Sequence, residues 1–227
     1  MKKRILCYLF SLLTGFLVFA GDVARFVDLG FSPDGRTYFF GQYGKFDQTF
    51  IPYAEIYAVD VQKNDFTKVF KSSGFSRMQD GLSAFEELKA KHNPYLFGSG
   101  AVPPKQVIYL RESLSSPTEV EFQDFERSTM VNPLIYTVKL TPHVEGWGDS
   151  LKSSFYITVE RRKPEGVLVD RTVIGNPDIK RAGVTAYSIE KIFLDAAGKS
   201  LVIVVEKTLQ DKDAISVRYM VETALLK

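Results

Sequence analysis

The side chains best suited to catalysis in this 227-residue sequence are four carboxylates that lie close together in the chain: Glu119, Glu121, Asp124 and Glu126. Two carboxyl groups about 5–9 Å apart can hydrolyse a glycosidic bond, one as the acid and the other as the base or nucleophile. On a β-strand, however, Glu119 and Glu121 share one face while Val120 and Phe122 share the other. The pattern therefore favours a solvated sheet face beside a buried face, and a catalytic pair is the alternative.

The only histidines, His92 and His143, are the two side chains that can act as near-neutral bases without a large pKa shift. His92 lies beside Asn93-Pro94, where we expect a helix to end, and His143 follows a proline in an expected loop. The sequence has no His-Glu-x-x-His motif, no Gly-x-Ser-x-Gly elbow, no Walker loop and no dinucleotide fingerprint. It therefore indicates structural histidines, and it identifies no catalytic residue, metal site or cofactor.

Aromatic residues are the stronger candidates for a binding role. Four of them lie within or directly beside an expected loop at residues 44–52, and the only tryptophan lies between two glycines. These candidates are Tyr43, Phe46, Phe50, Tyr53 and Trp147. Aromatic rings on a loop suit a sugar, a peptide or a partner protein. The alternative is that these rings are packed in the core. Because adjacent side chains on a strand point to opposite faces, a pair such as Phe39 and Phe40 favours a sheet that is packed on both sides.

The elements that must position these residues are mostly β-strands, because aromatic and β-branched residues alternate with polar ones along the chain. The expected strands are residues 26–31, 37–42, 53–61, 66–70, 106–111, 119–125, 134–141, 154–161, 167–173, 185–194, 200–207 and 214–223. Residues 98–104 and 142–149 are expected loops. The first four strands, with short connections, predict an antiparallel meander.

One helix is expected at about residues 76–91. Its predicted apolar face consists of Met78, Leu82, Phe85 and Leu88. Ser83 and Glu86 have the spacing of a capping box, and Asn93-Pro94 should end the helix because the residue before a proline disfavours the helical region.

The N-terminus predicts a secretory signal peptide over residues 1–20. Lys2, Lys3 and Arg4 precede an apolar run at residues 5–19, and Val18-Phe19-Ala20 forms a cleavage site. The alternative is an uncleaved membrane anchor, but the run is shorter than the roughly 20 residues that span a bilayer. Residues 21–227 should then form a single β-rich domain without a transmembrane span, exported to the periplasm or beyond.

Cleavage would also change the charge and the redox chemistry. Of the 29 basic residues 26 would remain against 27 acidic ones, a net charge of −1, which gives no general attraction for nucleic acid. The only cysteine, Cys7, would leave with the signal peptide, so the exported chain could form no disulfide.

A weak internal repeat relates residues 29–40 to residues 192–203, each with an apolar strand, a tight turn ending in glycine and a cation, and a second apolar strand. In the first copy, Phe-Ser-Pro-Asp-Gly-Arg at residues 31–36 resembles the hairpin of β-propeller blades in the TolB and WD40-like group. We therefore expect a mainly β fold of antiparallel meanders that resemble propeller blades, with one inserted amphipathic helix, in preference to a closed propeller.

Two blocks of sequence carry a family resemblance. The first includes residues 21–25, Gly-Phe-Ser-Pro-Asp-Gly at residues 30–35, Gln-Tyr-Gly at residues 42–44 and residues 50–57; the second runs from residues 155–160 through residues 187–189 to the last strands. Through these blocks the chain resembles a bacterial family of predicted secreted proteins of unknown function. The resemblance implies export and one β-rich unit, and it implies no activity.

Export, propeller-like hairpins and few catalytic groups together favour a non-enzymatic binding or interaction protein of the bacterial periplasm or envelope. Its expected partner is an envelope protein or a glycan, bound through the aromatic loops. One alternative is a carboxylate-based hydrolase acting on glycans or peptides, and another is a structural subunit of an envelope complex.

Overall fold

The computed structural model describes residues 21–72, 76–97, 106–112, 117–123, 133–195, 197–211 and 214–226. The predicted signal peptide with Cys7, the expected loop at residues 98–104, and Asp124 and Glu126 lie outside the described residues.

Within these residues the chain forms thirteen β-strands, one α-helix and one short 3₁₀ helix, so the predicted mainly β fold with one helix is confirmed. In chain order they are β1 (Arg25–Phe31), β2 (Thr37–Lys45), β3 (Pro52–Asp60), β4 (Asp65–Ser72), α1 (Gly81–Phe97), β5 (Gln106–Leu110), β6 (Glu119–Gln123), β7 (Ile135–Glu145), η1 (Gly148–Ser150), β8 (Lys152–Arg162), β9 (Leu168–Ile174), β10 (Arg181–Ala182), β11 (Val184–Leu194), β12 (Ser200–Asp211) and β13 (Ala214–Leu225).

The strands pair in three antiparallel sheets. The N-terminal sheet is the meander β1-β2-β3-β4, the central sheet has the order β13-β12-β11-β5, and the outer sheet has the order β10-β8-β7-β6 with β9 also paired to β8. None of these sheets closes on itself in the described part of the chain, and no propeller arrangement is present there. The predicted antiparallel pairing is therefore confirmed, and the likeness to propeller blades stays a prediction.

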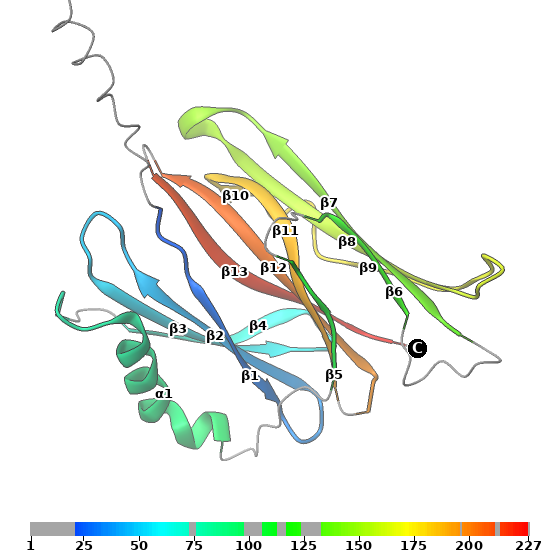
Figure 1. Ribbon diagram of the computed structural model, residues 1–227, viewed down its shortest axis with the longest axis horizontal. Coiled ribbons are helices and arrows are strands. Elements are labelled where there is room, and N and C mark those ends of the chain that lie inside the picture. Colours follow the sequence, from blue (N-terminus) through cyan, green and yellow to red (C-terminus); the bar gives the residue numbers. More distant parts are fainter. Residues whose placement is uncertain are drawn as a thin grey trace, which may run out of the picture.

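The three sheets and the helix are stacked in layers (Figure 1). Val202 and Val204 of the central sheet pack toward the N-terminal sheet, while Leu201, Ile203 and Val205 pack toward the outer sheet. Helix α1 covers the other face of the N-terminal sheet. Alternate residues of β12 thus serve two different cores, as the two-residue period of a strand requires.

The N-terminal sheet is packed on both faces, as the pair Phe39 and Phe40 predicted. Phe39 joins the cluster beneath α1, and Phe40 joins the cluster against the central sheet. The helix approaches the sheet closely at Gly41, where a Cβ atom would lie 2.3 Å from the ring of Phe85. A residue with a side chain at position 41 would therefore force the helix away from the sheet.

The predicted bounds of the helix were wrong at both ends. The helix begins at Gly81 instead of residue 76, because Asp80 supplies the cap: its Oδ1 accepts a hydrogen bond from the Ser83 N–H at 2.7 Å. The spacing of Ser83 and Glu86 therefore does not mark the start of the helix. The helix also runs through Asn93-Pro94 to Phe97, where Tyr95 packs edge-on against Phe70 and secures the last turn.

The buried face of the helix also differs from the predicted stripe. Phe85 and Leu88 are buried as expected, but Met78 precedes the helix and is 94% exposed, and Leu82 is 51% exposed. Ala84 is buried instead. The expected loop at residues 142–149 is shorter than predicted as well, since β7 continues through Pro142 to Glu145. Strand β6 ends its pairing opposite Lys139, which leaves that stretch of β7 as a sheet edge where a proline is tolerated.

The two hairpins of the internal repeat lie against each other in space. They are β1-β2 and β11-β12, and the Ser200 hydroxyl lies 3.5 Å from the carbonyl oxygen of Gly35 across the two turns. The tight turn of the first hairpin is formed as predicted, with the Gly35 N–H donating to the Ser32 carbonyl at 2.8 Å and Gly35 at φ 68°.

The segment that would follow signal cleavage is tied to β13. The Val217 N–H donates to the Asp22 carbonyl at 2.8 Å, and the Ala24 N–H donates to the Val217 carbonyl at 3.0 Å. A Cβ atom on Gly21 would overlap the carbonyl oxygen of Ile215, so the position accepts only glycine without rearrangement. Of the helices in the described ranges, none has the length and apolar character to cross a membrane.

Candidate functional site

The aromatic residues predicted around residues 44–52 are divided between two faces of the N-terminal sheet. Tyr53 is 5% exposed and packs with Phe46 on the side of the central sheet, with the two ring centres 4.8 Å apart. Tyr43 points to the opposite face and lies 5.5 Å from Phe85 of α1. The guanidinium of Arg218 covers the Tyr53 ring at 4.4 Å. The structure therefore brings Phe46 and Tyr53 together and separates Tyr43 from them.

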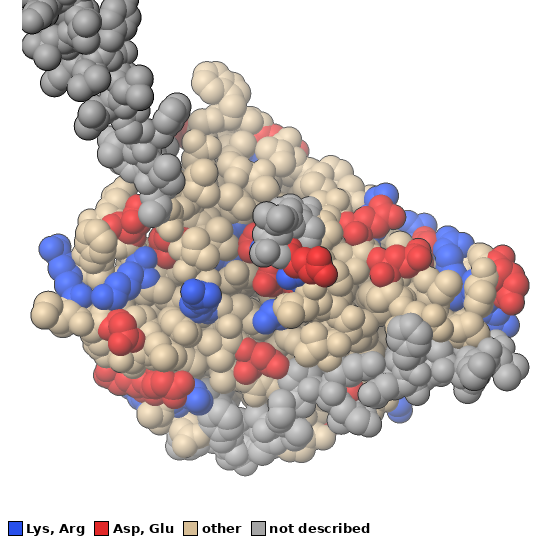
Figure 2. Space-filling model, viewed as in Figure 1, with Lys and Arg blue, Asp and Glu red and all other residues tan. Residues whose placement is uncertain are grey.

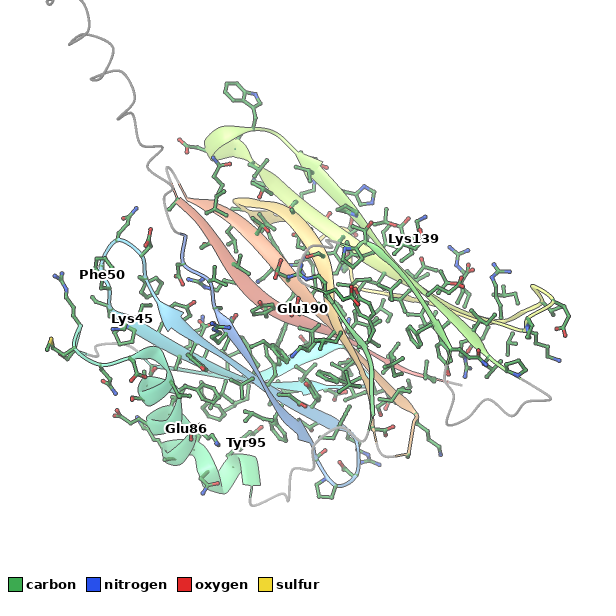
Figure 3. All side chains as sticks on the ribbon, viewed as in Figure 1. Lys45, Phe50, Glu86, Tyr95, Lys139 and Glu190 are labelled. Carbon is green, nitrogen blue, oxygen red and sulfur yellow. The ribbon has the colours of Figure 1, made fainter. Side chains whose placement is uncertain are left out.

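The other two predicted rings are exposed. Phe50 is 62% exposed at the tip of the β2-β3 hairpin, with φ at 55°, an uncommon value for a residue with a side chain (Figure 3). Trp147 is 86% exposed in the β7-β8 connection, next to η1. The two rings project from different sheets and so do not form one patch with each other.

The predicted solvated face at residues 119–122 is confirmed. Glu119 is exposed and its carboxylate lies 2.8 Å from the ammonium group of Lys139 on β7, while Val120 is 6% exposed (Figure 3). Glu121 is also exposed. The two glutamates thus lie on the solvent side of the outer sheet.

Both histidines pack against aromatic rings. His92 stacks on Phe70 at 4.0 Å, and His143 stacks on Tyr156 at 5.8 Å. Partial burial, together with the charge of Lys91, lowers the pKa of His92. The described side chains contain no group of three or more His, Cys, Asp or Glu residues able to hold a metal ion.

One cleft lined by polar and aromatic side chains was not predicted from the sequence. It consists of two adjoining cavities of about 550 and 300 Å³ along strand β13, and we call it the β13 cleft. The lining residues common to both cavities are Phe66, Ile179, Arg181 and Met220. Because these come from β4, from the β9-β10 connection, from β10 and from β13, all three sheets contribute to the walls.

Strand β13 can serve as the floor of the cleft because it is an edge strand of the central sheet. Two side-chain amides satisfy N–H groups along that edge: the Tyr219 N–H donates to Gln42 Oε1 at 2.8 Å, and the Thr223 N–H donates to Asn64 Oδ1 at 2.7 Å. Such capping blunts an edge that would otherwise pair with another strand. Asn64 reaches β13 from the β3-β4 turn, where it adopts φ 54°.

The larger cavity contains a buried carboxylate. Glu222 is 5% exposed, and its Oε2 accepts a hydrogen bond from the side-chain amide of Asn64. Burial raises the pKa of Glu222, while the hydrogen bond from Asn64 and the charge of Arg181 act in the opposite direction. Asp65 is the other carboxylate in the lining of this cavity, and it is exposed.

The smaller cavity is lined by aromatic rings and two cations. Phe40 and Tyr57 stack at 4.7 Å, and Phe66 lies 5.5 Å from Tyr57. Desolvation, reinforced by the nearby charge of Arg181, lowers the pKa of Lys207 to about 8. An amine in such surroundings is either protonated and stabilised by an anion, or deprotonated and able to act as a base.

A hydrogen-bonded network on the N-terminal sheet supports the smaller cavity. Tyr57 donates its hydroxyl hydrogen to Glu55, and Gln42 Nε2 donates to the same carboxylate at 2.8 Å. Although burial opposes it, the hydrogen bonds from Tyr57 and Lys71 lower the pKa of Glu55. The same environment raises the pKa of Tyr57 through burial and the negative charge of Glu55. These groups therefore hold Tyr57 in place as a neutral ring.

A second buried charge cluster lies in the central sheet. Arg111 is paired with Glu206, and its Nε lies 2.9 Å from Glu190 Oε2 without the alignment of a hydrogen bond (Figure 3). Burial, together with the repulsion of Glu206, raises the pKa of Glu190 although Arg111 opposes the shift. Arg111 pairs with two carboxylates of the same sheet and so ties the end of β5 to β11 and β12, which gives the cluster a structural role.

On the face shown in Figure 2, positive and negative side chains are interspersed over the described residues. Such a mixture gives no extended field of one sign to attract a polyanion.

Sequence reasoning missed Lys207 and Arg181 because each follows a charged neighbour, Glu206 or Lys180, and looks like an ordinary solvated residue. A signal was available for Glu222, because it and Thr223 are the polar residues in an otherwise apolar run from Met220 to Leu226. A lone carboxylate in such a run is unusual unless it has a partner.

Comparisons with known proteins agree with the predicted export. A family described as "Predicted secreted protein (DUF2259)" matches residues 39–224. The comparisons with curated proteins and with solved structures gave no match. The match extends from β2 to β13 and so includes the described lining of the cleft except Leu225. The chain therefore belongs to the DUF2259 family of predicted secreted proteins, whose function is unknown.

Proposed function

We propose that this exported protein is a non-enzymatic binding protein of the bacterial periplasm or envelope, and that its ligand occupies the β13 cleft. The observation that carries the proposal is the junction of two cavities, of about 550 and 300 Å³, where all three sheets meet. Small-molecule sites are typically concave and lined by aromatic side chains with a few polar groups that fix the orientation of the ligand. Phe66 and Met220 supply apolar surface in the cleft, and Arg181 supplies a polar group.

The proposal is tested by filling the cleft. Ile179 lines both cavities and is 54% exposed, so Ile179→Trp adds a ring there without disturbing the core. Val169 on β9 is 47% exposed and lies outside both linings, and Val169→Trp is the matched control. The probe is N-phenyl-1-naphthylamine, a neutral dye that fluoresces strongly in apolar sites.

We expect the unsubstituted protein and Val169→Trp to enhance the fluorescence of the dye equally, and Ile179→Trp to lose at least most of the enhancement. Equal enhancement by all three proteins would contradict a site in the cleft. Absence of enhancement by the unsubstituted protein would contradict an apolar binding site altogether.

The exposed aromatic loops support a second binding mode, in which a larger envelope component is held. Phe50 and Trp147 are 62% and 86% exposed, and the positive φ of Phe50 keeps its ring at the hairpin tip. Phe50→Ala and Trp147→Ala should then weaken the retention of an envelope glycan or protein on the immobilised chain, with unchanged thermal unfolding. A lower melting temperature with unchanged retention would assign the rings to packing.

Glu222 gives some support to the alternative of a carboxylate-based hydrolase, because it is a buried acid with a raised pKa in a cavity that also contains Asp65. That function would require hydrolysis of a glycan or peptide substrate that is abolished by Glu222→Gln. Broad glycosidase and peptidase assays that show no turnover would contradict it.

A further inference from the structure

The smaller cavity of the β13 cleft contains two cations that form no ion pair with any residue the structure describes. The side-chain ammonium of Lys207 makes no hydrogen bond or ion pair within the described part of the chain. Among the same residues, the side chain of Arg181 donates a hydrogen bond only to the Ile179 carbonyl, at 3.2 Å, and its guanidinium lies 5.0 Å from the centre of the Phe155 ring. Buried or half-buried cations are normally paired with an anion.

The other shielded arginines of this protein follow that rule. Arg161 is paired with Asp170, and Arg218 is paired with Asp22. Arg111 is paired with both Glu206 and Glu190. Among the shielded arginines that the structure describes, Arg181 therefore differs from Arg111, Arg161 and Arg218 in having no carboxylate partner.

The carboxylates nearest to the pair are already engaged. Glu55 accepts hydrogen bonds from Gln42 and Tyr57, and its other oxygen lies 2.9 Å from Lys71. Glu222 is bound to the amide of Asn64 in the larger cavity. The charge of Glu55 offsets part of the electrostatic repulsion between Arg181 and Lys207, and a bound anion would relieve the remainder.

The walls around the two cations are apolar. Phe40, Tyr57, Phe66 and Tyr219 line this cavity, and its volume of about 300 Å³ lies at the lower end of the range for small-molecule sites, roughly 300–1,000 Å³. Aromatic walls do not bind a hydrated inorganic anion, but they bind an alkyl or aryl group. The chemistry of the cavity thus combines a cationic pair with an apolar lining.

We infer that the ligand of the β13 cleft is a small amphipathic carboxylate, whose negative head lies between Lys207 and Arg181 and whose apolar body packs on the aromatic rings. The inference rests on the proposed binding function of the same cleft. The planar fork of an arginine matches the two oxygens of a carboxylate, and a lysine adds a point charge. Glu222 on the far side of Arg181 disfavours a head group with further negative charge.

The inference is tested with three probes on the protein purified after export. Decanoate carries both the head and the apolar body, decanol carries the body alone, and acetate carries the head alone. We expect decanoate, below its micelle-forming concentration, to displace N-phenyl-1-naphthylamine at a concentration roughly 10- to 100-fold lower than decanol, as expected for hydrogen bonds to a charged group. Acetate should not displace the dye.

Two substitutions and a control assign the effect to the cations. Lys207→Met and Arg181→Met should each reduce the preference for decanoate over decanol while the neutral dye still binds. Lys180→Met removes a neighbouring cation that is paired with Glu145 outside the cleft, and it should keep the preference. Lys207→Met should also raise the melting temperature, because it removes an unpaired cation from an apolar site.

The outcomes separate the two proposals. If decanoate and decanol displace the dye equally, or if Lys180→Met reduces the preference as much as Lys207→Met, the carboxylate inference is wrong and the binding cleft stands. If Lys207→Met lowers the melting temperature, Lys207 has a structural role and the inference is again wrong. If the dye itself does not bind to the unsubstituted protein, the proposed function is wrong.

Discussion

Asn64 joins the N-terminal sheet to the central sheet, and its replacement by alanine should be among the most destabilising single changes near the cleft. Its side-chain oxygen accepts the Thr223 N–H at 2.7 Å, and its amide donates to the carboxylate of Glu222. It also adopts φ 54°, a left-handed conformation that costs a residue with a side chain roughly 1–2 kcal/mol.

The magnitude follows from these contacts. Loss of the acceptor leaves a buried N–H without a partner, which costs about 1–3 kcal/mol, and loss of a hydrogen bond to a charged group costs about 1.5–3 kcal/mol. Water entering the larger cavity, of about 550 Å³, can replace part of each interaction, so we expect Asn64→Ala to lower the free energy of unfolding by about 3 kcal/mol. Asn64→Gly loses the same hydrogen bonds but relieves the backbone, and it should be roughly 1 kcal/mol less destabilising than alanine.

The measurement is urea unfolding of the three proteins at pH 7, followed by far-ultraviolet circular dichroism. Lys63→Ala in the same turn is the control, because Lys63 is exposed and lies 3.9 Å from Asp60, a pair that should contribute at most about 0.5 kcal/mol. If the free energy of unfolding of Asn64→Ala lies within about 0.5 kcal/mol of that of the unsubstituted protein, the side-chain amide does not stabilise the junction of the two sheets. If glycine and alanine are equally destabilising, the strain at φ 54° is not released as reasoned.

Three further predictions concern the buried charges. The folded state raises the pKa of Glu222 above its usual 4.5, so the folded chain retains a proton that the unfolded chain releases. The free energy of unfolding should therefore fall as the pH rises above 4.5. Glu222→Gln should remove that fall and be more stable than the unsubstituted protein at pH 7, as measured by urea titrations over a series of pH values. The folded state lowers the pKa of Lys207 from 10.5 to about 8, so the free energy of unfolding should rise with pH across that interval. Lys207→Met should increase the free energy of unfolding by at most about 3 kcal/mol at pH 7, and this increase should vanish near pH 10.5. An increase that does not depend on pH would contradict the assignment. Asp22→Asn removes the charge opposite Arg218, whose side chain is 17% exposed, and should lower the free energy of unfolding by about 2–4 kcal/mol. Asp34→Asn, in an exposed turn, is the control. Equal changes in the free energy of unfolding for the two variants would show that the buried pair contributes no more than an exposed carboxylate.

The strands could be predicted from the sequence because their signal is local. Alternation at Phe39 and Phe40 identified a strand packed on both sides, and the turn at residues 32–35 fixed the first hairpin. The helix was less well predicted, since Met78 fits the apolar spacing yet lies outside the helix, and Asp80 caps it. Its last turn depends on Tyr95 packing against Phe39 and Phe70, a contact that no helix rule contains.

The candidate site could not be predicted because its members are neighbours only in three dimensions. Phe66, Arg181 and Lys207 come from β4, β10 and β12, and each looks like an ordinary strand residue in its own segment. The aromatic residues Tyr43 and Tyr53 were grouped by their nearness in sequence, but the pleat of the sheet places them on opposite faces.

Local patterns in the amino-acid sequence were enough to predict a mainly β chain with one helix and its export, in agreement with the fold and the family. The edge position of β13 and the cleft between the three sheets could be recognised only after distant segments had packed together. Side-chain alternation and turn geometry act over a few residues, whereas desolvation and charge pairing depend on everything that packs nearby.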